Sequence, residues 1–157
     1  MLFRSEEFPV VKNVAADSVL TGIEAHADVK LTNELTAEVT YDWVQGELKA
    51  SGDPLPRMPP ARVLAGLTYQ KNAFQIGGSA QIVRDQTRVY DEELPTDGYA
   101  IAKFFASYSF NAGGVLNTMT ARLDNATDRL YRNHLNYLKD VLPEMGRSFR
   151  LVYSVGF

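Results

Sequence analysis

Three residues that could bind a metal ion alternate along one segment near the start of the sequence. Glu24, His26 and Asp28 occupy every second position, and carboxylate and imidazole groups are common ligands of divalent cations. In an extended strand, however, positions i, i+2 and i+4 spread over about 13 Å, which is too far for one ion. We therefore expect these side chains to form a solvated polar face, and no metal site is assigned.

Two polar segments further along the chain could contact a ligand. His134 lies in a long segment with no strand pattern, where a histidine can bind a ligand but is more often simply exposed to solvent. The acidic run 91–93 could attract cations, but two nearby arginines offset it, so a charged and solvated loop is the expectation. The candidate ligand-contacting residues are His134, Asp91 and Glu92.

The sequence carries no pattern for catalysis. Serine and threonine hydroxyls are present without a nucleophile elbow, and Gly113 and Gly114 predict a turn and not a phosphate cradle. Because the chain has no cysteine, disulfides and thiolate metal sites are excluded. A net charge of −3 without clustered lysine or arginine argues against nucleic acid. Neither an enzyme nor a cofactor is expected.

Apolar residues recur at every second position over most of the chain, which is the period of a β-strand and not of a helix. From Ile23 to Leu31, the odd positions are apolar and the even positions are polar. No run of about 18 apolar residues occurs, so a membrane-spanning helix is excluded. The pattern predicts an all-β chain with seven strands, at 19–31, 35–43, 62–69, 73–83, 99–110, 115–124 and 147–157.

The connections between the predicted strands alternate in length. Short connections fall at 32–34, 70–72 and 111–114, and long ones at 44–61, 84–98 and 125–146. Bacterial outer-membrane barrels have short periplasmic turns and long extracellular loops, whereas a soluble β-sandwich follows no such rule. The sequence therefore predicts a portion of an antiparallel transmembrane β-barrel.

Large aromatic residues lie near the ends of the predicted strands. Transmembrane barrels carry aromatic girdles at both membrane interfaces, so these positions fit an outer and an inner girdle. In a β-sandwich the same residues would fill the core. The outer set is Tyr41 and Trp43, and the inner set is Tyr69, Phe74, Tyr108 and Phe110.

A short motif follows the sixth predicted strand. Asn125, Asp128 and Tyr131 match the pattern N-L-F-D-x-x-Y found near the end of TonB-dependent receptors, whereas Ala126 and Thr127 depart from its Leu-Phe pair. Other segments, such as Gly-Ile-Glu at 22–24, also resemble this family. Together they resemble the C-terminal β-barrel portion of a TonB-dependent outer-membrane receptor, over roughly residues 8–157.

The last predicted strand is similar to the targeting signal of outer-membrane proteins. In that family, the barrel-assembly machinery reads a C-terminal Phe preceded by apolar residues at alternate positions. Physically, such an edge strand can pair with a template while one apolar face meets lipid. The residues of this assembly signal are Phe149, Leu151, Tyr153, Val155 and Phe157.

The resemblance implies a barrel of about 22 strands in the bacterial outer membrane, to which this chain contributes about seven. Residues 19–157 would be the C-terminal barrel strands, and residues 1–18 an incoming loop or the remnant of a preceding strand. No export signal, plug domain or TonB-contacting segment is visible in the sequence, so we expect a fragment of the receptor.

The resemblance also implies a function and its partners. The receptor would import a scarce nutrient, such as a siderophore or other metal chelate, haem or a metal ion. Its partners would be outer-membrane lipid, the barrel-assembly machinery, the nutrient, and TonB through the N-terminal plug. Two alternatives stay open: a small passive or adhesive outer-membrane barrel, and a soluble β-sandwich that binds a partner.

Overall fold

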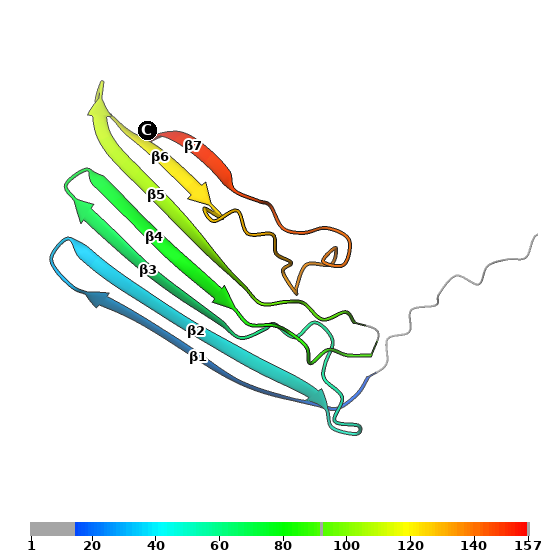
Figure 1. Cartoon of the computed structure of the whole chain (residues 1–157). Coiled ribbons are helices and arrows are strands. Elements are labelled where there is room, and N and C mark those ends of the chain that lie inside the picture. Colours follow the sequence, from blue (N-terminus) through cyan, green and yellow to red (C-terminus); the bar gives the residue numbers. More distant parts are fainter. Residues whose placement is uncertain (1–14, 92, 157) are drawn as a thin grey trace, which may run out of the picture.

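The chain forms a single antiparallel sheet in the computed structural model, which describes residues 15–91 and 93–156. Each strand pairs with the next one along the chain, so β1 and β7 lie at opposite edges (Figure 1). The prediction of an all-β, antiparallel fold with seven strands is confirmed. The strands are β1 (Ser18–Lys30), β2 (Leu35–Leu48), β3 (Arg62–Lys71), β4 (Phe74–Val83), β5 (Tyr99–Ala112), β6 (Val115–Asp124) and β7 (Ser148–Gly156).

Short turns gather at one end of the sheet and long loops at the other (Figure 1). The turns are 31–34, 72–73 and 113–114, and the loops are 49–61, 84–98 and 125–147. Gly113 and Gly114 have φ angles of 61° and 79°, which suit a two-residue hairpin turn. The predicted alternation of short and long connections is therefore confirmed.

Strand β2 continues past its predicted end at residue 43. The chain turns back after β2 and bonds to it, since the Leu48 amide donates to the Asp53 carbonyl at 2.8 Å and the Leu55 amide to the Gly46 carbonyl at 2.9 Å. The extension, residues 44–48, pairs with residues 18–22 of β1 on one side and with this loop segment on the other.

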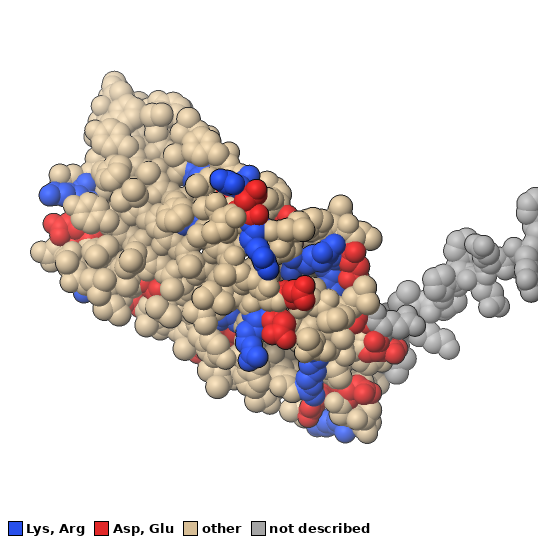
Figure 2. All heavy atoms as spheres, viewed as in Figure 1, with Lys and Arg blue, Asp and Glu red and all other residues tan. Residues whose placement is uncertain are grey.

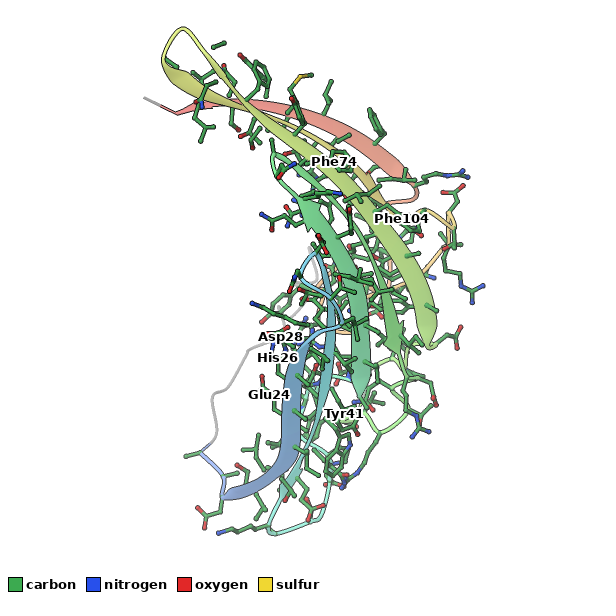
Figure 3. All side chains as sticks on the ribbon, turned by 90° about the vertical axis from the view of Figure 1, so that its left-hand side faces the viewer. Glu24, His26, Asp28, Tyr41, Phe74 and Phe104 are labelled. Atoms are coloured by element: carbon green, nitrogen blue, oxygen red, sulfur yellow. The ribbon has the colours of Figure 1, made fainter. Side chains whose placement is uncertain are left out.

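The two faces of the curved sheet carry different side chains (Figure 3). Glu24, His26 and Asp28 lie on the concave side, whereas Tyr41 and Phe104 lie on the convex side. Strand register extends both faces across the sheet, because Tyr41 pairs with Val63 and cross-strand partners share a face. The result is a concave face that carries most of the polar strand residues and an apolar convex face, as alternation predicted.

The convex face is apolar and exposed. In the seven strands, only Glu47 and Lys71 bring a charge in register with this face, and both lie near strand ends. Figure 2 shows the broad middle of this face almost without charge, and charged side chains gathered toward the long loops. Its exposed large residues include Ile23, Val29, Val39, Leu67, Ile76, Ile82, Phe104, Met119, Phe149 and Leu151.

Burial of apolar side chains within the sheet is slight. Among the described residues, only Val83 and Ile101 are buried hydrophobic residues. An apolar face of this extent is unfavourable in water, because each exposed Å² of apolar surface costs about 25 cal/mol. The convex face is therefore stable only where an apolar environment covers it. Among residues 15–91 and 93–156, no helix has the length and apolar character needed to cross a membrane.

Two apolar residues of β5 interrupt the alternation because they pack on the concave side. Ile101 is buried at the loop end of the strand. Phe105 covers Gly77 of the neighbouring strand, where an added Cβ atom would lie 2.5 Å from the Phe105 Cε1 atom. A glycine is therefore needed opposite this ring.

Candidate functional site

The three long loops meet in a buried polar cluster, and we call the assembled loops 49–61, 84–98 and 125–147 the loop cap. Glu93 lies at its centre. One Glu93 carboxylate oxygen accepts a hydrogen bond from the Arg57 backbone amide at 2.9 Å, and the other accepts one from the Lys139 ammonium at 3.0 Å. Lys139 also donates to the Leu94 carbonyl at 2.7 Å. One carboxylate thus joins all three loops.

His134 is enclosed in the same cluster, with 1% of its surface exposed. Its Nε2 atom lies 3.1 Å from the Glu93 carboxylate, and its Nδ1 atom lies 3.0 Å from the Thr96 hydroxyl and 3.2 Å from the Lys139 ammonium. These partners fit a neutral ring that donates from Nε2 and accepts at Nδ1. A metal ion at Nδ1 would therefore have to displace the ammonium group.

Ionisation within the cluster favours a neutral imidazole beside an ion pair. Burial lowers the pKa of His134, and the positive charge of Lys139 lowers it further. Burial by itself would raise the pKa of Glu93, but the Arg57 amide and Lys139 outweigh it and hold that pKa below its ordinary value. At neutral pH the cluster therefore contains a charged Glu93 and Lys139 with an uncharged His134.

Arg57 strengthens the contact between the first and third loops. Its guanidinium donates to the Leu135 carbonyl at 2.7 Å. The same group lies over the Tyr137 ring, 3.4 Å from the ring centroid, which is a cation–π arrangement. The Arg57 backbone has a φ of 60°, an uncommon conformation for a residue other than glycine. Several independent contacts therefore hold the cap closed.

The motif after β6 lies at the base of the third loop. The Asn125 side chain is buried, donates to the Arg129 and Met145 carbonyls at 2.9 and 3.1 Å, and accepts from the Arg129 amide. Asp128 accepts from the Arg147 amide at 2.8 Å, and this hydrogen bond holds the pKa of Asp128 below its ordinary value. These two residues connect the start of the loop to its end.

Tyr131 completes the motif through an aromatic contact. Its ring centroid lies 4.2 Å from that of Tyr99, at the start of β5, and its carbonyl accepts from the Glu144 amide at 2.9 Å. The motif residues predicted from the sequence thus share one local structure, which anchors the third loop to the sheet.

Comparison with known proteins identifies the family. Residues 4–126 match the family described as TonB dependent receptor-like, beta-barrel. The chain belongs to this family. Among solved structures, this receptor barrel is similar to a protein described as Copper transporter OprC, with 22% identity and a TM-score of 0.78. The alignment covers 88% of this chain and 23% of that structure, so it shows a shared fold over a minor part of the larger protein. No curated protein matches the sequence.

Membership of the TonB-dependent receptor barrels decides between the folds left open by the sequence. A β-sandwich requires two packed sheets, whereas the described residues of this receptor form one sheet. β1 and β7 are not paired with each other, so the seven described strands form an open sheet. The β-sandwich is therefore wrong for the described residues, and the family match favours a receptor barrel over a small passive barrel. The family comprises receptors and not enzymes.

The predicted assembly signal occupies the edge strand β7 of the receptor sheet. Phe149, Leu151, Tyr153 and Val155 are exposed along the convex face, while Phe157 lies outside the described residues. Asp91 is exposed in the second loop with a φ of 38°, and Glu92 also lies outside the described residues. The ligand-contacting role of Asp91, Glu92 and His134 stays a prediction.

On the concave face of the receptor, both ring nitrogens of His26 contact neighbouring side chains. Its Nε2 atom lies 2.9 Å from an Asp28 oxygen, and its Nδ1 atom lies 2.9 Å from the Thr40 hydroxyl. Within residues 15–91 and 93–156, no three His, Asp or Glu side chains are arranged to hold a metal ion. The solvated polar face expected for this segment agrees with these contacts.

Sequence reasoning missed the centre of the loop cap. It placed Glu93 in a solvated acidic run. In the structure, only 12% of the Glu93 side chain is exposed, because loops distant in the sequence close over it. Lys139 and Arg57 lie 46 and 36 residues from Glu93 along the chain, and no local pattern links them. Only a signal of spatial contact, such as covariation between homologues, could have paired them.

Proposed function

We propose that this chain is the C-terminal part of the barrel of a TonB-dependent receptor that imports a scarce nutrient through the bacterial outer membrane. The observation that carries the proposal is the exposed, apolar convex face, which carries a charge only near strand ends and matches the lipid-facing band of a transmembrane barrel. Residues 19–157 would supply barrel wall and extracellular loops, with the short turns in the periplasm. Energy from the inner membrane would reach the receptor through TonB and the plug.

We further propose that the substrate is a metal chelate, haem or a metal ion. Support comes from the family and from the structural likeness to a protein described as a copper transporter. Because both nitrogens of His134 have partners, a ligand arriving from outside would first meet exposed loop residues such as Asp91. In this proposal His134 shapes the loop cap, and ligand contact falls to side chains on its surface.

The test begins with the location of the receptor in its source cell. We would probe outer-membrane fractions with antibody to the 125–147 loop, with and without boiling. A heat-modifiable band several times larger than 17.5 kDa is expected, because folded barrels resist detergent until heated. Recovery of the chain in the soluble fraction would refute the membrane assignment.

Uptake measurements then test transport. Cells that express the receptor are supplied with radiolabelled copper, iron chelate or haem, in matched strains with and without TonB. Accumulation of one substrate that requires both the receptor and TonB is expected. Equal accumulation of all three in both strains would contradict the transport proposal, even if the protein resides in the outer membrane.

A further inference from the structure

A groove of about 470 Å³ opens where the loop ends of β2, β3 and β4 meet loops 49–61 and 84–98. Trp43, Val63 and Ile82 form an apolar floor that continues the convex face. Loop residues around Met58 form the opposite wall, held by a hydrogen bond of 2.9 Å from the Gln86 side chain to the Met58 carbonyl. The convex face of the sheet thus forms one side of the groove, and the loops form the other.

Arginine side chains line the outer edge of this groove. The Arg84 amide donates to the Ala61 carbonyl at 2.9 Å, so the ladder continues beyond β4 and places Arg84 on the same face as Ile82. Arg84 is exposed. Of the three arginines at the groove, Arg62 forms an ion pair with Asp42 at 2.6 Å and Arg88 with Glu47 at 2.8 Å. Arg84 forms no ion pair with another residue of 15–91 and 93–156, so its guanidinium supplies the free positive charge of this edge.

Arg88 has donor capacity that its neighbours do not use. Its Nη2 atom donates to the Glu47 carboxylate at 2.8 Å. Its Nη1 atom is buried and has no hydrogen-bond partner among residues 15–91 and 93–156. A buried guanidinium N–H without an acceptor is unfavourable. A hydrogen-bond acceptor placed in the groove beside this atom would therefore be stabilised.

We propose that the groove binds a phosphorylated lipid of the outer leaflet, with its phosphate between Arg84 and Arg88 and an acyl chain over Trp43, Val63 and Ile82. Guanidinium groups bind phosphate oxygens through paired, charge-assisted hydrogen bonds. Trp43 belongs to the aromatic level that marks a membrane interface, where such a headgroup lies. The apolar floor distinguishes this ligand from a free anion, which would leave the floor exposed. The proposal rests on the membrane placement in the proposed function.

Lipid retention by the complete receptor tests the proposal. The receptor is purified in detergent and mixed with dioleoyl phosphatidic acid, with dioleoylglycerol or with inorganic phosphate, and bound lipid is measured by native mass spectrometry. We expect the Arg84→Gln/Arg88→Gln double variant to lose at least about tenfold in retention of phosphatidic acid. Arg122→Gln, which removes an arginine from the concave face, should retain lipid like the wild type. Dioleoylglycerol should bind weakly to all three.

A second variant keeps the test informative if the double variant does not fold. Glu47→Gln removes the carboxylate that competes for Arg88, so its retention of phosphatidic acid should rise. Equal retention by the double variant and the wild type would overturn the proposal. So would displacement of the lipid by an equal concentration of inorganic phosphate, which would indicate a free-anion site.

Failure of the lipid proposal can be told apart from failure of the membrane assignment. The heat-modifiable band is scored first for the wild type and for each variant, and it does not depend on the groove. A receptor that passes this check but shows no difference in lipid retention would refute the groove alone.

Discussion

The sheet and the loop cap of this receptor barrel rely on opposite kinds of contact. The sheet exposes its apolar side chains on the convex face and buries hardly any, so its environment must supply the apolar contact. The cap instead buries charged and polar groups, namely His134 and Lys139 beside Glu93. The two regions should therefore be sensitive to opposite substitutions: a new charge should destabilise the sheet, and the loss of a charge should destabilise the cap.

The largest effect is expected from removal of the buried ammonium group. Lys139→Met leaves the Glu93 carboxylate without its ion-pair partner in a buried site, which costs about 3–5 kcal/mol for pairs of this kind. The cap should open while the sheet stays folded. Hydrogen exchange of loops 84–98 and 125–147 measures the change, and Lys49→Met, at an exposed loop position, is the control. Unchanged exchange in both loops would contradict the central role of the cluster.

A charge on the convex face is expected to have the next largest effect. Val39 lies within β2 on the convex face and is 48% exposed. Val39→Arg should destabilise the inserted barrel by about 2–4 kcal/mol, because an arginine would face hydrocarbon. The heat-modifiable fraction in outer membranes reports insertion.

Thr40→Arg is the matched control for the convex face, since Thr40 is the next residue along β2 and faces the concave side. It should be tolerated. Equal loss of the folded band in both variants would refute the assignment of the two faces.

Loss of the motif asparagine should have a smaller effect, confined to the third loop. Asn125→Ala leaves the Arg129 and Met145 carbonyls without their side-chain donor, at a cost of about 1–3 kcal/mol. Faster proteolysis within 125–147 is expected. Asn133→Ala, which removes one exposed hydrogen bond to Leu135, should change proteolysis little. Equal sensitivity of the two variants would exclude an anchoring role for Asn125.

Acidification should loosen the cap by the smallest amount, because a single group titrates. The pKa of His134 in the folded cap lies below its ordinary value of 6.5, so the unfolded loop binds the proton more readily. The contribution of His134 to stability is therefore complete above pH 6.5 and decreases as the pH falls below that value. Glu93 keeps its charge below its ordinary pKa of 4.5, so it does not contribute in this window.

Hydrogen exchange of the cap, corrected for the intrinsic effect of pH, measures this change between pH 7 and pH 5. His134→Gln should abolish the dependence, and the exchange of β3 and β4 should not change. An equal response in the strands would show that acid acts on the whole receptor and not on the cap.

The strands of this protein are a consequence of local sequence. Alternation of residue types such as Glu24, Ala25 and His26 fixes which side chains share a face, because successive residues of a strand point in opposite directions. Alternating connection lengths then predict which end carries the loops. For these reasons the number of strands, their order and the polarity of each face could be predicted from the amino-acid sequence.

Tertiary structure alone decided the loop cap and the groove. Glu93, Lys139 and Arg57 belong to loops with no periodic pattern, and their contacts span 36 to 46 residues of sequence. The Glu93 carboxylate can hold the loops together because it is buried beside its partners. Its burial in turn depends on which loops close over it. The sequence by itself therefore determined the strands and faces of the receptor, whereas the meeting of its loops, and the arginines they bring beside the apolar face, follow only from the assembled fold.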